Sequence, residues 1–305
     1  LAPDLDLPEL ASRRHGARAA LPEALLALGR NAEASRAFAQ LASASEDPAL
    51  RREAELRSAL ALVTERSCGR AVRPLRAFVA AHGEEEAAAD AVVRALWQLA
   101  ACQRAGSAQH AAVLEEVVRA GARGELGREA RERVAEAAFL LADRGFADAT
   151  NVRLHVPAGE NIEDLADGLR AALEQPLERV RALLSGYASV ERHGVGRWIV
   201  AARQRSGAAL EALDRAVLAA SWELPRDLTS QRNRLNRPTL AQIQRITEMR
   251  AGEILRAQAV AIRCRAAAHY RRALEIAGTA GVDSEESRAA RERLEAMELP
   301  DRCPR

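Results

Sequence analysis

Four cysteines have the most distinctive covalent chemistry in this sequence: Cys68, Cys102, Cys264 and Cys303. No two of them form a CxxC motif, so their spacing favours neither a zinc site nor a redox-active dithiol. An even number of cysteines permits structural disulfides without requiring them. Which cysteines can pair therefore depends on where the predicted helices place them.

The predicted helices bring Cys264 and Cys303 to the same level. A long helix over 238–277 continues for about 13 residues, or ~20 Å, past Cys264. A last helix over about 284–297 then returns by ~20 Å and places segment 298–303 beside Cys264. A cysteine so near the chain end has little reason to be buried as an apolar residue. We therefore predict a Cys264–Cys303 disulfide, which would stabilise the fold by roughly 3 to 4 kcal/mol.

Cys68 and Cys102 form a second candidate pair, because both are predicted at helix ends in adjacent repeats. Disulfides persist in oxidising compartments, so such pairs would indicate an exported protein. The alternative is four unpaired thiols in a cytoplasmic protein. Residue 1 is Leu rather than Met, so we expect a fragment or a processed form, in which a missing signal peptide does not weigh against export.

The six histidines and the carboxylates show no spacing typical of a metal or catalytic site. His82 and His193 each precede a glycine, which favours a role at a helix C-terminus, where a cation complements the helix dipole. The sequence contains no lysine, GxSxG or GxGxxG, which excludes lysine Schiff bases and the common phosphate-loop and serine-hydrolase motifs. We therefore expect no enzyme: no catalytic residue, cofactor, metal or small-molecule substrate.

Arginines concentrate in the C-terminal part, with 11 between residues 226 and 272 against three acidic residues. On the predicted long helix, Arg245, Arg256 and Arg263 lie within about 20° of one direction. This pattern predicts a basic stripe that docks an acidic protein segment or anionic head groups. The alternative is a set of solvated arginines. Five residues are expected on the opposite, inward side: Leu240, Ile243, Ile254, Ala261 and Ala268.

Composition sets the class of the protein. Basic and acidic residues nearly cancel, at 45 against 43, and aromatic residues are only 3%. A field or stacking surface for nucleic acid is therefore not indicated. No stretch approaches the ~20 apolar residues of a membrane span. The abundance of Ala, Leu, Arg and Glu predicts an all-α protein.

The N-terminal half repeats with a period of about 40 residues. Short amphipathic helices are expected at about 31–42, 71–81 and 112–120, each preceding a longer helix. Repeats of this length built from helix pairs are typical of helical solenoids, in which each pair needs a neighbour to cover its apolar face. We predict TPR-like repeats over 1–145, arranged as a right-handed superhelical solenoid of helix pairs.

The second region, 146–305, differs from these repeats. Residues 151–157 alternate with period two and form the only strand-like segment. Long helices follow, including the one over 238–277. We expect this region to continue the helical fold with a short extended insertion.

The chain resembles a deltaproteobacterial family of tetratricopeptide-repeat proteins, the AglT-like family of the adventurous gliding machinery. The resemblance rests on six segments: Val152-Arg-Leu-His-Val-Pro, Leu183-Leu-Ser-Gly-Tyr-Ala-Ser-Val, the segment 198–211 that begins Trp-Ile-Val-Ala-Ala, Ala216-Val-Leu-Ala-Ala with Pro225 and Leu228, His269-Tyr-Arg-Arg-Ala-Leu-Glu-Ile-Ala, and Gly281-Val-Asp. It implies a non-enzymatic scaffold in a bacterial envelope complex, such as a gliding-motility machine.

The expected partners are other proteins of that complex, and the expected location is periplasmic or outer-membrane-associated. Two alternatives stay open. One is a lipoprotein-type TPR factor for outer-membrane assembly. The other is a cytoplasmic regulator that presents its basic face to nucleic acid.

Overall fold

The computed structural model describes residues 20–63, 68–231, 237–300 and 303. Within these residues the chain is predominantly helical, and the only strands have two residues each. The predicted all-α class is therefore confirmed. The chain divides into two units, Leu1–Ala137 and Ala138–Arg305. This division falls within helix α7 (Arg128–Asp143), whereas the division predicted between 145 and 146 follows that helix.

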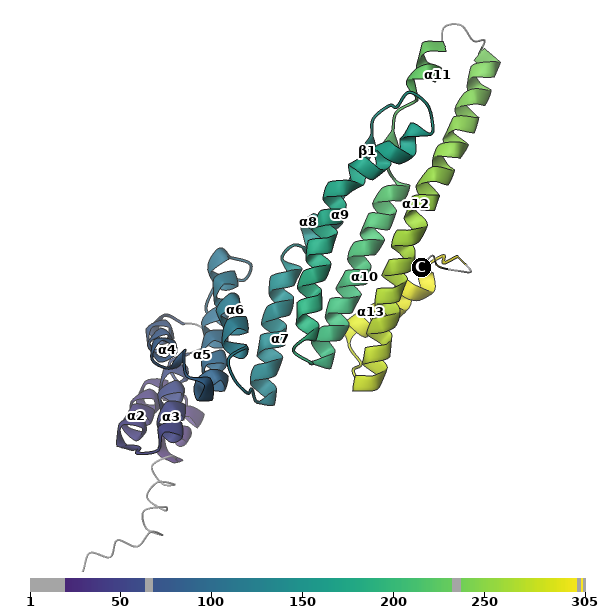
Figure 1. Ribbon diagram of the computed structural model, residues 1–305. Helices are drawn as coiled ribbons and strands as arrows, with labels where there is room; N and C mark the ends of the chain where they lie inside the picture. Colours follow the sequence, from purple (N-terminus) through teal and green to yellow (C-terminus); the bar gives the residue numbers. More distant parts are fainter. Residues whose placement is uncertain (1–19, 64–67, 232–236, 301–302, 304–305) are drawn as a thin grey trace, which may run out of the picture. The chain divides into compact units, whose positions relative to one another are not determined.

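The first unit consists of consecutive helices that pack against their neighbours in sequence. Helices begin at Asn31, Gly69 and Ala108, near the three starts expected from the 40-residue period. They have 14 residues each, whereas the helices after the first two have 13, so the expected alternation of short and longer helices was wrong there. After helical residues 20–27, the elements are α2 (Asn31–Ala44), α3 (Pro48–Leu60), α4 (Gly69–His82), the 3₁₀ turn η1 (Glu86–Ala88), α5 (Ala89–Ala101), α6 (Ala108–Gly121) and the first part of α7 (Figure 1).

Local signals explain where these helices begin. Asp47 accepts a hydrogen bond from the backbone N–H of Ala49, and Pro48 occupies the first position of α3, both of which favour a helix start. At the start of α6, the side chain of Ser107 likewise accepts a hydrogen bond from the backbone N–H of His110. Each helix buries an apolar side; Phe38 of α2 and Phe78 of α4 are both buried.

The second unit is built around long helices. Its elements are the end of α7, α8 (Phe146–Thr150), β1 (His155–Val156), α9 (Asp164–Glu191), α10 (Gly196–Leu218), β2 (Ser221–Trp222), α11 (Arg226–Gln231), α12 (Arg237–Ala280) and α13 (Glu285–Ala296). Helix α12 is the long helix predicted over 238–277. Helix α9 continues through Pro176.

The extended insertion predicted over 151–157 contains β1, and the sequence did not reveal its partner β2 at Ser221–Trp222. Strand β1 pairs in parallel with β2, in the register His155↔Ser221 and Val156↔Trp222. A strand needs a second strand to satisfy its backbone groups. The expectation of a single strand-like segment was therefore wrong.

Helices α10 and α12 form the most extensive helix pair of the described residues. They approach closely because small side chains line the contact; Ala209, Ala266 and Ala273 are fully buried. At Gly207 the Tyr270 ring takes the space that a side chain would occupy: a Cβ there would lie 2.6 Å from Cε1 of Tyr270. Glycine is thus required at this crossing.

Two buried tyrosines anchor the helices of this unit to each other through carboxylates. Tyr187 of α9 donates a hydrogen bond to Oδ1 of Asp143 at 2.5 Å, and Arg205 of α10 lies 3.3 Å from the same oxygen. Tyr270 of α12 donates to Oε2 of Glu211 at 2.8 Å. Burial, followed by the hydrogen bond to a carboxylate, raises the pKa of each phenol. Both tyrosines are therefore held as neutral donors.

A third polar cluster joins α9, α10 and α12. Arg203 binds Glu191, with Nε 2.6 Å from Oε1, and its Nη1 lies 3.3 Å from Nδ1 of His269. A neutral imidazole accepts this contact. Burial and then the positive charge of Arg203 lower the pKa of His269 to about 4.

We expect Gly207→Ala to destabilise the protein. The overpacking against Tyr270 costs about 1–3 kcal/mol, and the better helix propensity of Ala offsets up to about 1 kcal/mol. A net loss of about 1–2 kcal/mol in the free energy of unfolding should appear in urea titrations.

Gly278→Ala is the matched control, because a Cβ at Gly278 of α12 would meet no atom within 4 Å. Its stability should stay equal or rise by up to about 1 kcal/mol. Equal stability of the Gly207→Ala variant and the wild type would contradict the close contact.

The stability should also fall on acidification because of His269. Its pKa is about 4 in the folded chain, whereas an unfolded histidine titrates near 6.5. The unfolded chain therefore binds the extra proton first, and about 3 kcal/mol of stability is lost as the pH falls from about 6.5 through about 4. Urea midpoints measured across this range should show a smaller loss for His269→Asn, whose amide accepts from Arg203 without titrating. The same pH dependence in both proteins would refute this assignment.

Candidate functional site

The structure joins the four cysteines in the two pairs that the sequence proposed. The Cα atoms of Cys68 and Cys102 are 5.5 Å apart, and those of Cys264 and Cys303 are 5.6 Å apart. Both separations are typical of disulfides. Cys68 precedes α4 and Cys102 follows α5. The first bond therefore ties the start of one helix to the end of the next within the first unit.

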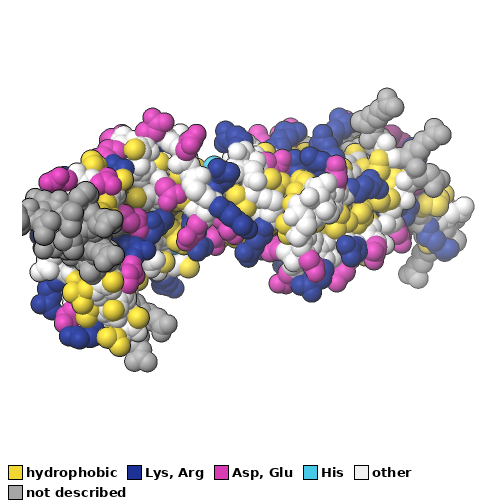
Figure 2. All heavy atoms as spheres, turned by 90° about the horizontal axis from the view of Figure 1, so that it is seen from below, with side chains coloured by type: hydrophobic (Ala, Val, Ile, Leu, Met, Phe, Trp, Pro, Cys, Tyr) yellow, Lys and Arg dark blue, Asp and Glu magenta, His cyan; other side chains and the backbone are white. Residues whose placement is uncertain are grey.

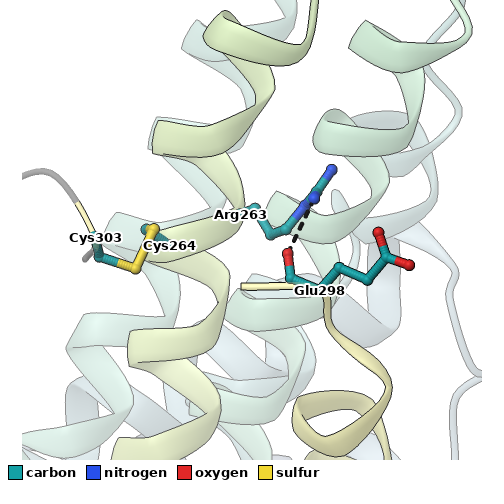
Figure 3. Close-up of a disulfide and its surroundings, with 4 residues drawn as sticks. All are labelled: Arg263, Cys264, Glu298 and Cys303. Atoms are coloured by element: carbon teal, nitrogen blue, oxygen red, sulfur yellow. Dashed lines mark hydrogen bonds between the residues drawn. A yellow bond between two sulfur atoms is a disulfide. The ribbon is translucent and has the colours of Figure 1, made fainter. Parts of the chain in front are cut away.

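The second disulfide is part of a clasp formed by Arg263, Cys264, Glu298 and Cys303 (Figure 3). Neighbouring residues of α12 hold the two ends of segment 298–303: Nη1 of Arg263 donates to the backbone carbonyl of Glu298 at 3.1 Å, and Cys264 binds Cys303. Cys264 is buried, whereas Cys303 is exposed. The clasp fixes the chain after α13 to the middle of α12.

The three arginines of the predicted stripe do not share one environment. Arg245 and Arg256 are exposed, and neither has an acidic partner within ion-pair distance in the part of the chain that is described. Arg263 instead faces α10, where its Nε lies 3.1 Å from Oδ2 of Asp214; the two side chains are only 19% and 8% exposed. Arg263 thus serves the fold and is unavailable for docking.

The expected inward side of α12 is also corrected. Ala261 and Ala268, expected to be buried, are exposed, and Ile243 and Ile254 are only partly buried. Helix α10 covers the side that carries Arg263 and Tyr270. The side chain of Leu240 lies outside the described residues. Arg245, Arg256 and Arg263 share one direction on α12, as expected. At Arg263, however, this direction faces α10 rather than solvent.

A groove of about 710 Å³ lies between α2, α3 and α4 of the first unit. Its walls combine small residues, a phenyl ring and a few polar groups. The residues that line it include Ala42, Ala59, Ala77, Phe78 and Ala81, with Arg51 and Glu55 beside them. Because most of these side chains are small, the groove is open to the side chains of another molecule.

His82 closes one end of α4 beside this groove. Its Nε2 lies 2.7 Å from Oε2 of Glu55, and its Nδ1 lies 3.1 Å from Oε1 of Glu85. Burial lowers the pKa of the ring, but the two carboxylates outweigh this effect and raise it above its usual value. His82 thus lies at the C-terminal end of α4, as expected, and also connects α4 to α3 through Glu55.

Sequence reasoning missed one cluster at the paired strands. Nδ1 of His155 lies 3.0 Å from Oγ of Ser221, and its Nε2 lies 3.4 Å from Oε1 of Glu223. The imidazole and the carboxylate are both more than half exposed. Serine hydrolases present Nε2 to the serine and bury the acid. This arrangement therefore links strands rather than activating a nucleophile. No sequence signal pointed to it, because the partners are more than 60 residues apart.

The described residues contain neither a cluster of three or more metal-ligating side chains nor a helix long and apolar enough to cross a membrane. Acidic and basic side chains are intermixed on the face shown in Figure 2. Comparison of the chain with protein-family models, with curated proteins and with solved structures finds no match.

We expect all four cysteines to be oxidised in protein prepared without reductant. Peptide mapping by mass spectrometry should find Cys68 linked to Cys102 and Cys264 linked to Cys303. The double variant Cys264→Ser/Cys303→Ser should lose roughly 3 to 4 kcal/mol of unfolding free energy, because its unfolded chain is no longer constrained. Alkylation of these cysteines without reductant, or a different pairing, would show the assignment to be wrong.

Proposed function

We propose that this chain is a non-enzymatic protein–protein interaction scaffold whose helix pairs form a TPR-like, right-handed superhelical solenoid. The observation that carries the proposal is the groove between α2, α3 and α4. Three successive helices with short side chains at their contacts leave a continuous concave surface, as stacked helix pairs do in solenoids.

The chemistry of the groove suits a segment of a partner protein. Ala42, Ala59 and Phe78 provide an apolar floor, and Ala77 and Ala81 are exposed along the α4 wall. Apolar side chains of a partner would be buried there, which is the main favourable term in association. The polar groups at the edge would set orientation rather than affinity. The proposal includes no cofactor and no small-molecule substrate.

Two disulfides support a location in an oxidising compartment. We therefore place the protein in the periplasm or at the outer membrane, as part of an envelope complex such as the gliding machinery of the AglT-like family. A lipoprotein-type assembly factor is a second envelope function compatible with the same groove. A nucleic-acid-binding cytoplasmic regulator is disfavoured by a net charge of only +2 and by few aromatic residues.

Filling the groove should abolish partner binding without unfolding the protein. Ala77→Trp/Ala81→Trp places two indoles over the floor from exposed positions of α4, so the core is not overpacked. The immobilised full chain would be incubated with solubilised envelopes of its native cell, and the retained proteins would be quantified by mass spectrometry. We expect the variant to lose at least about tenfold of one or more partners, equivalent to about 1.4 kcal/mol.

Ala112→Trp is the control, because Ala112 is exposed on α6 and does not line the groove. It should retain the partners at the wild-type level. Loss of the same proteins from both variants, or from neither, would rule out the groove as the binding site.

A further inference from the structure

The N-terminal part of α12 extends well beyond the C-terminal end of α10. Asp214 contacts Arg263 and Gly207 contacts Tyr270, so the two helices run antiparallel. Helix α10 ends at Leu218, about one turn beyond Asp214. From this level, α12 extends toward its N-terminus for roughly 20 residues, or about 30 Å. Figure 1 shows α12 extending past the end of α10.

The side of α12 that α10 covers at Arg263 is therefore open further along the helix. At 100° per residue, Arg245, Arg256 and Met249 lie within about 40° of the direction of Arg263. Met249 is 60% exposed, and Ile246, on the adjacent edge, is 53% exposed. We call Arg245, Ile246, Met249 and Arg256 the α12 ledge.

Where α10 covers this side of α12, its side chains show which chemical groups match the surface. Helix α10 lays small side chains against α12 and places the carboxylate of Asp214 on Arg263, which leaves the pair almost buried. The ledge presents the same combination of arginine and apolar groups, but α10 has already ended there. A helix that has apolar side chains flanked by carboxylates would cover the ledge in the same way.

We propose that the α12 ledge binds an acidic amphipathic helix of a partner protein, which continues the surface of α10 along α12. Arg245 and Arg256 bind the carboxylates of that helix, and Ile246 and Met249 contact its apolar side. Glu253, which is exposed beside these residues, is already paired with Arg250 at 2.9 Å, which leaves Arg245 and Arg256 to bind the partner's carboxylates; binding to anionic lipid is an outcome that the test separates. The ledge is separate from the groove of the first unit, so the two proposals fail independently.

The test uses the full chain and two synthetic amphipathic helical peptides of about 18 residues, or five turns. Both have leucines at the same positions, and one carries Glu and the other Arg on the flanks. Fluorescence anisotropy should show the Glu peptide binding at least about tenfold more tightly. Arg245→Glu/Arg256→Glu should remove this preference, and Met249→Ser should weaken binding of the Glu peptide about threefold, the scale of a partly exposed contact.

Arg265→Glu is the matched control, because Arg265 is exposed on the opposite side of α12; it should bind as the wild type does. Equal binding of both peptides, or binding that survives Arg245→Glu/Arg256→Glu, would overturn the proposal. So would ledge-dependent binding of phosphatidylglycerol vesicles, or ledge-dependent self-association in sedimentation, by a chain that does not bind the Glu peptide.

Discussion

The close contact of α10 with α12 sets the positions of nearly everything else in the second unit. It is possible because Gly207 leaves room for the ring of Tyr270 and because alanines line both helices. With the register set at this crossing, Arg263 meets Asp214, Tyr270 meets Glu211, and Cys264 faces the chain end. A shift of one residue would rotate α12 by 100° and separate all three pairs.

Arginine suits this arrangement because its planar fork donates in several directions at once. Arg263 uses Nε and Nη2 for Asp214 and Nη1 for the carbonyl of Glu298. Arg203 likewise binds Glu191 and approaches His269. Buried carboxylates that lack such partners would cost several kcal/mol each. The arginines that face the core thus serve the fold, whereas Arg245 and Arg256 remain exposed on the α12 ledge.

Much of this fold follows from the sequence. Alanine-rich composition gave the all-α class, the 40-residue period located α2, α4 and α6, and helix lengths brought Cys264 to Cys303. The inward side of α12 did not follow, because alanines occur around the whole helix and apolar periodicity cannot choose between Ala261 and Ala266. The choice comes from Asp214 and Gly207, which lie on another helix. The groove was equally hidden, since three helices must pack before it exists.

The register of α10 against α12 is tested most directly by a double-mutant cycle on Asp214 and Arg263. Unfolding free energies of Asp214→Asn, Arg263→Gln and the double variant isolate the energy that the two side chains share. Because the pair is almost buried, we predict a coupling of at least about 1 kcal/mol. Effects that add to within about 0.3 kcal/mol would mean that the two side chains do not meet, and would contradict the register on which the clasp and the α12 ledge depend.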